Sequence, residues 1–206
     1  MKDSVAAKPS IRISATITKA TVPNNETEIK LAVPDAAAGR RLFRSAGFRV
    51  FKRRVLEIND VFDTPGLKLR RGALLVRVRR AGNVATLTYK GRPIAGKHKS
   101  REELELQISD APMMSTILGR LGYQPVFRYE KYRTEYCQPG ARGVATVDET
   151  PIGTFLELEG APSWIDRTAR RLGFAETDYI TDSYGRLYLD WCSRQGLKPS
   201  NMVFHA

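Results

Sequence analysis

Charged and uncharged residues alternate in several short stretches of the 206-residue chain. In the stretch NNETEIKLAV, Glu26, Glu28 and Lys30 occupy every second position, with Thr27 and Ile29 between them. Because successive side chains of a β-strand point to opposite faces, this spacing predicts one face with two carboxylates and an ammonium group. Such a face is either an ordinary solvated surface or part of a site for a cation and an anion together.

The same period of two recurs in later segments, each with one charged face and one apolar face. Residues of like charge often stand two positions apart, about 7 Å from one another, and repel unless a counter-charge lies between them. The charged positions are Arg77, Arg79, Lys90, Arg101, Glu103, Glu105, Lys131, Arg133, Glu135, Asp148, Glu157 and Glu159. Solvation of one sheet face explains the alternation as well.

Turn-forming residues divide the chain into predicted strands and helices. Strands are predicted over about 25–33, 48–62, 74–81, 84–91, 101–109, 126–137, 143–149 and 153–160. Helices are predicted within 34–47, 109–122 and 160–173, with Asp35 and Asp110 as N-caps and a glycine ending each helix. A fourth helix is predicted over about 182–195, starting at Asp182.

Eight strands with mostly short connections predict an α+β protein built on an eight-stranded antiparallel β-barrel, with helices packed on the outside. The charged face would then line the lumen. We expect residues 25–195 to form a single tunnel domain, residues 1–24 an N-terminal tail or edge segment, and residues 196–206 a C-terminal tail. A lumen rich in lysine and arginine needs acids or a polyanion, and clustered carboxylates suit Mg²⁺ or Mn²⁺. A basic wall beside such a metal is typical of a phosphate-chain site.

The net charge of +12 is compatible with a nucleic acid, an anionic membrane or a small polyanion. No nucleic-acid partner is expected, because Tyr89, Tyr132 and Tyr136 lie on the face opposite the basic residues. No membrane partner is expected either, since the chain lacks a run of about 18 apolar residues and a signal-like N-terminus. Cys137 and Cys192 are far apart and fit free thiols, so a cytoplasmic location is expected.

The order of several sequence blocks resembles the CYTH superfamily, also called triphosphate tunnel metalloenzymes. The blocks are ETEIK (26–30), VFDTPGLKLRRGALLVRVRR (61–80), LTYKG (87–91), REELELQ (101–107), LGYQPVFRYEKYRTEY (121–136), VATVDETPIGTFLELEG (144–160) and TDSYGRLY (181–188). The resemblance implies an eight-stranded tunnel that binds a triphosphate along a basic wall and Mg²⁺ or Mn²⁺ along an acidic wall.

The resemblance also implies roles for individual residues. The triphosphate contacts would be Lys30, Arg77, Arg79, Lys90, Lys131 and Arg133. The metal ligands would be Glu26, Glu28, Asp148, Glu157 and Glu159, and the catalytic set Glu26, Glu28, Lys30, Lys90 and Glu157. Tyr184 is expected to be structural. A lysine with a lowered pKa or a metal-bound hydroxide is a better general base than His98 or His205, which fall in a loop and in the tail.

Members of this superfamily include class IV adenylyl cyclases, thiamine triphosphatases and inorganic triphosphatases, and the phosphate-binding residues do not distinguish them. The length and the 121–136 block look most like the bacterial cyclase-type branch, so we predict a cyclase-like enzyme that converts ATP to cyclic AMP and pyrophosphate. A triphosphate hydrolase and a non-catalytic polyphosphate- or nucleotide-binding protein are the alternatives. The expected partner is a small-molecule triphosphate, namely ATP, thiamine triphosphate or tripolyphosphate, and a homodimer is left open.

Overall fold

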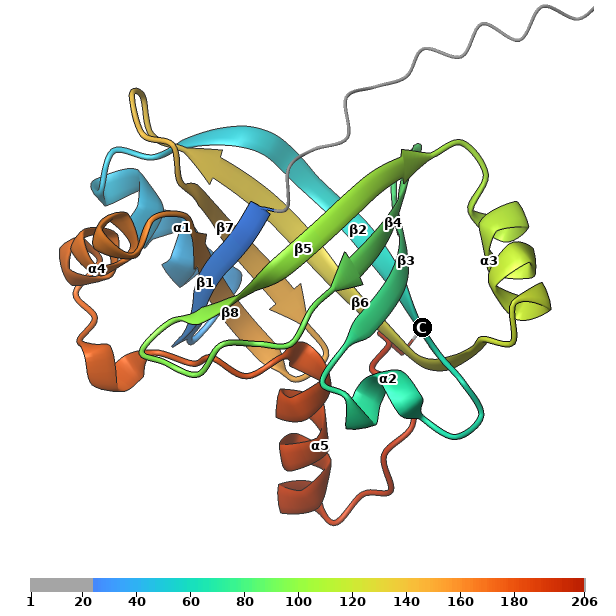
Figure 1. Cartoon of the computed structure of the whole chain (residues 1–206). Helices are drawn as coiled ribbons and strands as arrows, with labels where there is room; N and C mark the ends of the chain where they lie inside the picture. Colours follow the sequence, from blue (N-terminus) through green and yellow to red (C-terminus); the bar gives the residue numbers. More distant parts are fainter. Residues whose placement is uncertain (1–23, 206) are drawn as a thin grey trace, which may run out of the picture.

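Eight antiparallel strands close into a barrel in the order β1-β5-β4-β3-β2-β6-β7-β8, which confirms the predicted fold class (Figure 1). The computed structural model describes residues 24–205, so the predicted tail or edge segment at 1–24 lies outside them apart from Asn24. The strands are β1 (Asn24–Val33), β2 (Arg49–Asp63), β3 (Leu75–Ala81), β4 (Val84–Lys90), β5 (Lys99–Ile108), β6 (Gln124–Cys137), β7 (Val144–Thr150) and β8 (Gly153–Glu159).

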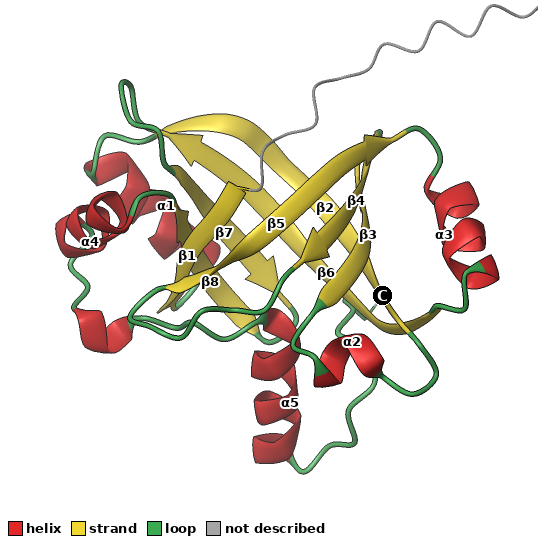
Figure 2. Cartoon of the chain, viewed as in Figure 1, coloured by secondary structure: helices red, strands yellow, loops and turns green. Residues whose placement is uncertain are grey.

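All helices of the described residues lie outside the barrel (Figure 2). They are α1 (Ala36–Ser45), α2 (Lys68–Arg71), α3 (Ala111–Arg120), α4 (Pro162–Arg171), a 3₁₀ helix η1 (Glu176–Asp178) and α5 (Tyr184–Gln195). The predicted N-caps Asp35 and Asp110 accept hydrogen bonds from backbone N–H groups three residues on, at 2.7 and 2.8 Å. For α5 the prediction is wrong by one residue, because Ser183 rather than Asp182 caps the helix.

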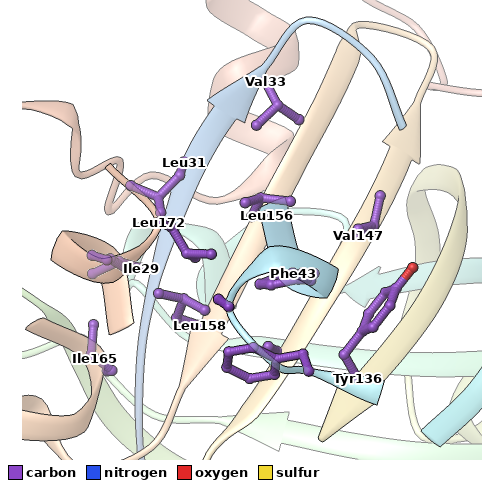
Figure 3. Close-up of a cluster of buried hydrophobic side chains, with 14 residues drawn as sticks. Ile29, Leu31, Val33, Phe43, Tyr136, Val147, Leu156, Leu158, Ile165 and Leu172 are labelled. Carbon is purple, nitrogen blue, oxygen red and sulfur yellow. The ribbon is translucent and has the colours of Figure 1, made fainter. Parts of the chain in front are cut away.

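The main hydrophobic core lies between the barrel and the pair of helices α1 and α4. Figure 3 shows Phe43 of α1 pointing onto Leu156, Leu158 and Val147 of the sheet, and Ile165 of α4 belongs to the same cluster. A Cβ atom added to Gly39 of α1 would lie 2.9 Å from a Leu156 methyl carbon. The glycine therefore allows α1 to approach the sheet closely.

Helix α5 and the residues after it close one end of the barrel. Tyr184 and Tyr188 of α5 pack against Tyr129 and Phe155 of the strands in a second buried cluster. Residues 196–205 run back along β6, where the backbone N–H of Met202 donates to the carbonyl of Arg128 at 2.9 Å. In Figure 1 α5 lies below the barrel, and α3 lies on the side opposite α1 and α4.

Both cysteines are free thiols, as expected; Cys192 is buried and Cys137 is half-buried. Within residues 24–205, the helices are all too short or too polar to cross a membrane.

Candidate functional site in a charged tunnel

A cavity of about 2050 Å³ lies inside the barrel and is lined by inward-facing residues of every strand. Ten of the sequence-predicted site residues line this cavity: Glu26, Glu28, Lys30, Arg77, Arg79, Lys90, Lys131, Arg133, Glu157 and Glu159. Asp148 does not line it and is fully buried in the wall. The alternation in the sequence therefore identifies the face that points inward, and the tunnel contains acids and bases side by side.

Asp148 is the centre of the most buried part of this network. Lys131 donates to its carboxylate at 2.7 Å, Arg133 donates at 2.6 and 2.7 Å, and the Tyr184 hydroxyl donates at 2.8 Å. Burial alone would raise the pKa of Asp148, but Arg133 and Lys131 hold it well below its usual range. Both carboxylate oxygens are thus occupied by protein donors. The structure favours a positioning role for Asp148, and its assignment as a metal ligand stays a prediction.

Lys30 joins two of the predicted acids across the β1–β8 pair. Its ammonium lies 3.1 Å from Glu28 and 3.3 Å from Glu157, and Glu157 also pairs with Arg133. Burial opposes the charged form of Lys30, yet these two carboxylates raise its pKa above the ordinary value. Lys30 is therefore a fixed positive charge in the tunnel wall.

Lys90 of β4 and Arg77 of β3 add two further cations to the tunnel wall. Lys90 donates to Glu26 at 2.5 Å and lies 3.1 Å from Glu103. Arg77 donates to the Tyr129 hydroxyl at 3.0 Å and to Thr88 at 3.1 Å. The Nε–H of Arg77 is buried and has no acceptor within residues 24–205, so this guanidinium retains donor capacity for a ligand oxygen.

Arg79 of β3 is the last of the predicted phosphate contacts, and its partners in the tunnel wall lie on β2. It lies 3.7 Å from Glu57 and donates to the side-chain oxygen of Asn59 at 3.3 Å. Burial would raise the pKa of Glu57, but Lys131, Arg133 and Arg79 lower it to about 2. Glu57 is therefore an anion that balances three of the predicted phosphate contacts.

The acids at one end of β1 and β8 differ in how well nearby cations compensate them. Glu28 and Glu159 are direct cross-strand partners. Burial, assisted by neighbouring carboxylates, raises the pKa of Glu26 to about 7 in spite of Lys90. Withdrawal from bulk water and the nearby Glu26 carboxylate likewise raise the pKa of Glu159 to about 7, although the residue as a whole is exposed at the mouth. Burial would also raise the pKa of Glu28, but Lys30 and Lys99 hold it well below its usual range.

The donor chemistry of this acidic mouth fits Mg²⁺ or Mn²⁺, which prefer hard carboxylate oxygens. In the present conformation lysines occupy part of the carboxylate oxygens, with Lys99 and Lys30 both on one oxygen of Glu28 at 2.9 and 3.1 Å. No group of three or more acidic, histidine or cysteine side chains within residues 24–205 is already arranged to hold a metal. Metal binding would require these lysine contacts to be exchanged, and the metal stays a prediction.

Four residues of the network were missed by the sequence reasoning. Lys99 was missed because β5 starts two residues earlier than predicted, although it shares the parity of Arg101. Tyr129 has the parity of Lys131 and could have been found by extending that pattern. Glu57 and Asn59 lie on β2, whose first residues are exposed on both faces, so that no alternation marks the strand.

Neither histidine takes part in the ionic network. His98 borders the cavity, but its Nε2 atom lies 2.8 Å from Asp166 of α4. His205 is exposed near the end of the described residues. The imidazole of His98 therefore holds the β4–β5 connection against α4.

The profile of the CYTH domain matches residues 24–184. The chain is 30% identical over 142 residues to a candidate adenylate cyclase of Methanocaldococcus jannaschii. The aligned residues cover 68% of this chain and 79% of that protein. The structure of a candidate adenylate cyclase from Vibrio parahaemolyticus is similar with a TM-score of 0.69 at 18% identity, over 81% of this chain and 98% of that one.

The structure of HpAC1 from Hippeastrum, a candidate adenylyl cyclase described with a dominant triphosphatase activity, has the same fold. Its TM-score is 0.59 at 20% identity, and the match covers 84% of this chain and 97% of that one. The matched residues contain all eight strands and every charged side chain of the tunnel described above. The chain therefore belongs to the CYTH domain family.

Proposed function

We propose that this protein is a metal-dependent enzyme that holds the triphosphate of a small molecule in its tunnel, and that it acts as an adenylyl cyclase on ATP. The observation that carries the proposal is the convergence of buried Lys30, Arg77 and Lys131 and half-buried Arg133 on one cavity. Without a ligand these cations are neutralised by glutamates and aspartate of the same tunnel. A triphosphate would take over part of that neutralisation.

The basic residues would divide the work according to their geometry. Arg77 and Arg133 present planar guanidinium groups suited to two oxygens of one phosphate, whereas Lys30 and Lys131 act as point charges. Each is fixed by neighbouring residues before a ligand arrives, so little reorganisation is needed when charge develops on the phosphate oxygens. Positioning of this kind is the main protein contribution to phosphoryl and nucleotidyl transfer.

The acidic mouth would hold Mg²⁺ or Mn²⁺ through Glu26, Glu28 and Glu159, with Glu157 deeper in the tunnel. The bound metal would neutralise phosphate charge and lower the pKa of the attacking hydroxyl. Asp148 would keep Lys131 and Arg133 in position through the contacts described above.

Lys99 is the best candidate for the proton acceptor. Burial lowers its pKa, with Lys30 and Arg101 acting in the same direction against Glu28, and its side chain lines the cavity. A lowered pKa increases the fraction of the lysine that is a neutral amine and can accept a proton. In the cyclase reaction the 3′-oxygen bonds to the α-phosphorus, its proton passes to the amine, and the α-phosphorus bond to pyrophosphate breaks. By contrast, the raised pKa of Lys30 keeps it cationic.

A triphosphate hydrolase is the second candidate, because the Hippeastrum protein of the same fold is described with a dominant triphosphatase activity. The same basic wall would hold the substrate, and water would attack a terminal phosphorus instead. The name of the Methanocaldococcus relative supports the cyclase. The two reactions differ in their products and can be separated directly.

Phosphorus NMR of the purified protein with Mg²⁺ or Mn²⁺ distinguishes these reactions when ATP, thiamine triphosphate and tripolyphosphate are offered separately. Cyclic AMP with pyrophosphate selects the cyclase, and orthophosphate release selects the hydrolase. Glu28→Gln should lose the activity, whereas Glu102→Gln, which changes an outward-facing acid of β5, should retain it. Absence of turnover with all three substrates and both metals would contradict both enzyme proposals and favour a binding protein.

A further inference from the structure

The basic excess of the chain is not explained by the tunnel. The basic residues that line the tunnel cavity are Lys30, Lys52, Arg70, Arg77, Arg79, Lys90, Lys99, Arg101, Lys131, Arg133, Arg142 and Arg186. They are matched to within one by the lining acids Glu26, Glu28, Asp63, Glu103, Glu105, Glu135, Glu157, Glu159 and Asp182 together with the wall residues Glu57 and Asp148. The net charge of +12 is therefore carried almost entirely by residues elsewhere in the chain.

Part of this excess surrounds a second hollow of about 560 Å³ on the α4 side of the barrel. The β6–β7 turn, residues 138–143, forms one wall and contributes Arg142. One face of α4 forms the other wall, where Trp164, Arg167 and Arg171 follow one another at spacings of three and four. Three guanidinium groups thus border a single small hollow.

None of these three arginines has a carboxylate within ion-pair distance in the part of the chain that the structure describes. Other exposed arginines do have one: Arg54 lies 2.8 Å from Glu149, and Arg128 lies 2.6 Å from Asp60. Like charges gathered without a counter-charge repel one another, and a bound anion would remove that repulsion.

The β6–β7 turn packs directly against Trp164, another residue that lines the hollow. A Cβ atom on Gly143 would lie 2.4 Å from atoms of the Trp164 ring, so the glycine lets the β6–β7 turn press directly on the indole. The indole Nε1–H is buried and lacks an acceptor within residues 24–205. A buried N–H without an acceptor costs free energy, so this indole is a polar group that the described residues leave unsatisfied.

We propose that Arg142, Arg167 and Arg171 form a second anion site, separate from the tunnel, for a phosphate-bearing ligand. Arginine is suited to such a ligand because its guanidinium donates two parallel hydrogen bonds to phosphate oxygens. Arg142 and Ala161 line both this hollow and the tunnel cavity, so the site adjoins the tunnel. An anion held there would neutralise part of the positive charge of the three arginines beside the tunnel and so weaken their attraction for arriving polyanions. The inference does not rest on the proposed reaction.

The fluorescence of Trp164 can test this site, because the chain contains only two tryptophans. In a Trp191→Phe background, titration with pyrophosphate in the absence of metal should change the Trp164 emission saturably. The double variant Arg167→Gln/Arg171→Gln should bind at least about tenfold more weakly, since it loses charge-assisted contacts. Arg120→Gln, an exposed change at the end of α3, should leave the titration unchanged.

A variant of the tunnel separates the two sites. Arg77→Gln in the same background should retain the Trp164 titration, because Arg77 does not border the hollow. The proposal is overturned if no saturable change occurs, or if the double arginine variant titrates like its parent. It is also overturned if Arg77→Gln alone abolishes the signal, since pyrophosphate would then be reporting from the tunnel. Unchanged circular dichroism of each variant shows that its fold persists.

Discussion

Replacement of Asp148 by asparagine tests whether the tunnel wall depends on one buried carboxylate. The substitution keeps the shape of the side chain and removes its charge. It leaves buried Lys131 and half-buried Arg133 with weaker compensation. It also replaces the carboxylate that accepts the Tyr184 hydroxyl hydrogen bond by an amide. Breaking a buried ion pair by removing one partner costs about 3–5 kcal/mol.

Two other acids remain beside Lys131 and Arg133 in the variant, so we expect a loss of stability at the lower end of that range. Glu57 lies 3.6 Å from Lys131, and Glu157 lies 4.0 Å from Lys131 and also pairs with Arg133. We therefore expect Asp148→Asn to lower the free energy of unfolding by about 3 kcal/mol, or Tm by ~6–12 °C for a chain of this size.

Urea unfolding at pH 7 followed by circular dichroism measures this loss. Asp190→Asn is the matched control, because its ion pair with Arg186 is exposed and should contribute less than about 1 kcal/mol. The lowered pKa of Asp148 stabilises the folded state above the unfolded pKa of about 3.9, and this stabilisation disappears as the pH falls below that value. The wild-type protein should therefore lose more stability on acidification than Asp148→Asn. Equal stability of Asp148→Asn and the wild type at pH 7 would refute the reasoning.

Three further predictions concern the acids and the helix packing. Glu28→Ala and Glu157→Ala should each abolish metal-dependent turnover while circular dichroism keeps its wild-type form; retained activity in both would mean that the acidic wall is misassigned. Since the pKa of Glu26 is raised to about 7, Mn²⁺ affinity measured by calorimetry should increase from pH 6 to pH 8. Over the same interval the metal-free protein should lose stability, because the folded state binds more protons than the unfolded state, and Glu26→Gln should reduce that loss. Gly39→Ala should lower the free energy of unfolding by about 1 kcal/mol, since overpacking against Leu156 outweighs the better helix propensity; a more stable variant would show that the contact relaxes.

The alternation of charged and apolar residues in the sequence was sufficient to predict which face of most strands is charged. Arg77, Lys131 and Glu157 face the tunnel because a period of two has only two registers, and the other register would bury charge against α1, α3 or α4. The helix caps were predictable for a similar local reason, since Asp35 and Asp110 act on residues three positions away.

The remaining features depend on contacts between distant residues. No local pattern indicates that Tyr184 donates to Asp148, or that residues after α5 return to β6. The short helix α2 was missed because Leu67 and Ala73, which flank it, adopt left-handed backbone conformations that their side chains do not favour. Closure of the barrel also buries Asp148 behind Lys131 and Arg133, and the sequence of β7 alone does not indicate this.

Equilibrium binding of a non-hydrolysable ATP analogue in the presence of Mn²⁺ tests the central claim most directly. Lys131 and Arg128 lie on the same strand, the first buried in the tunnel wall and the second on the outer face beside Asp60. Isothermal titration should show that Lys131→Met weakens binding about a hundredfold, as expected for loss of a buried charged contact, whereas Arg128→Gln changes the affinity less than about twofold. Equal affinities of the wild type and Lys131→Met would contradict the placement of a triphosphate in this tunnel.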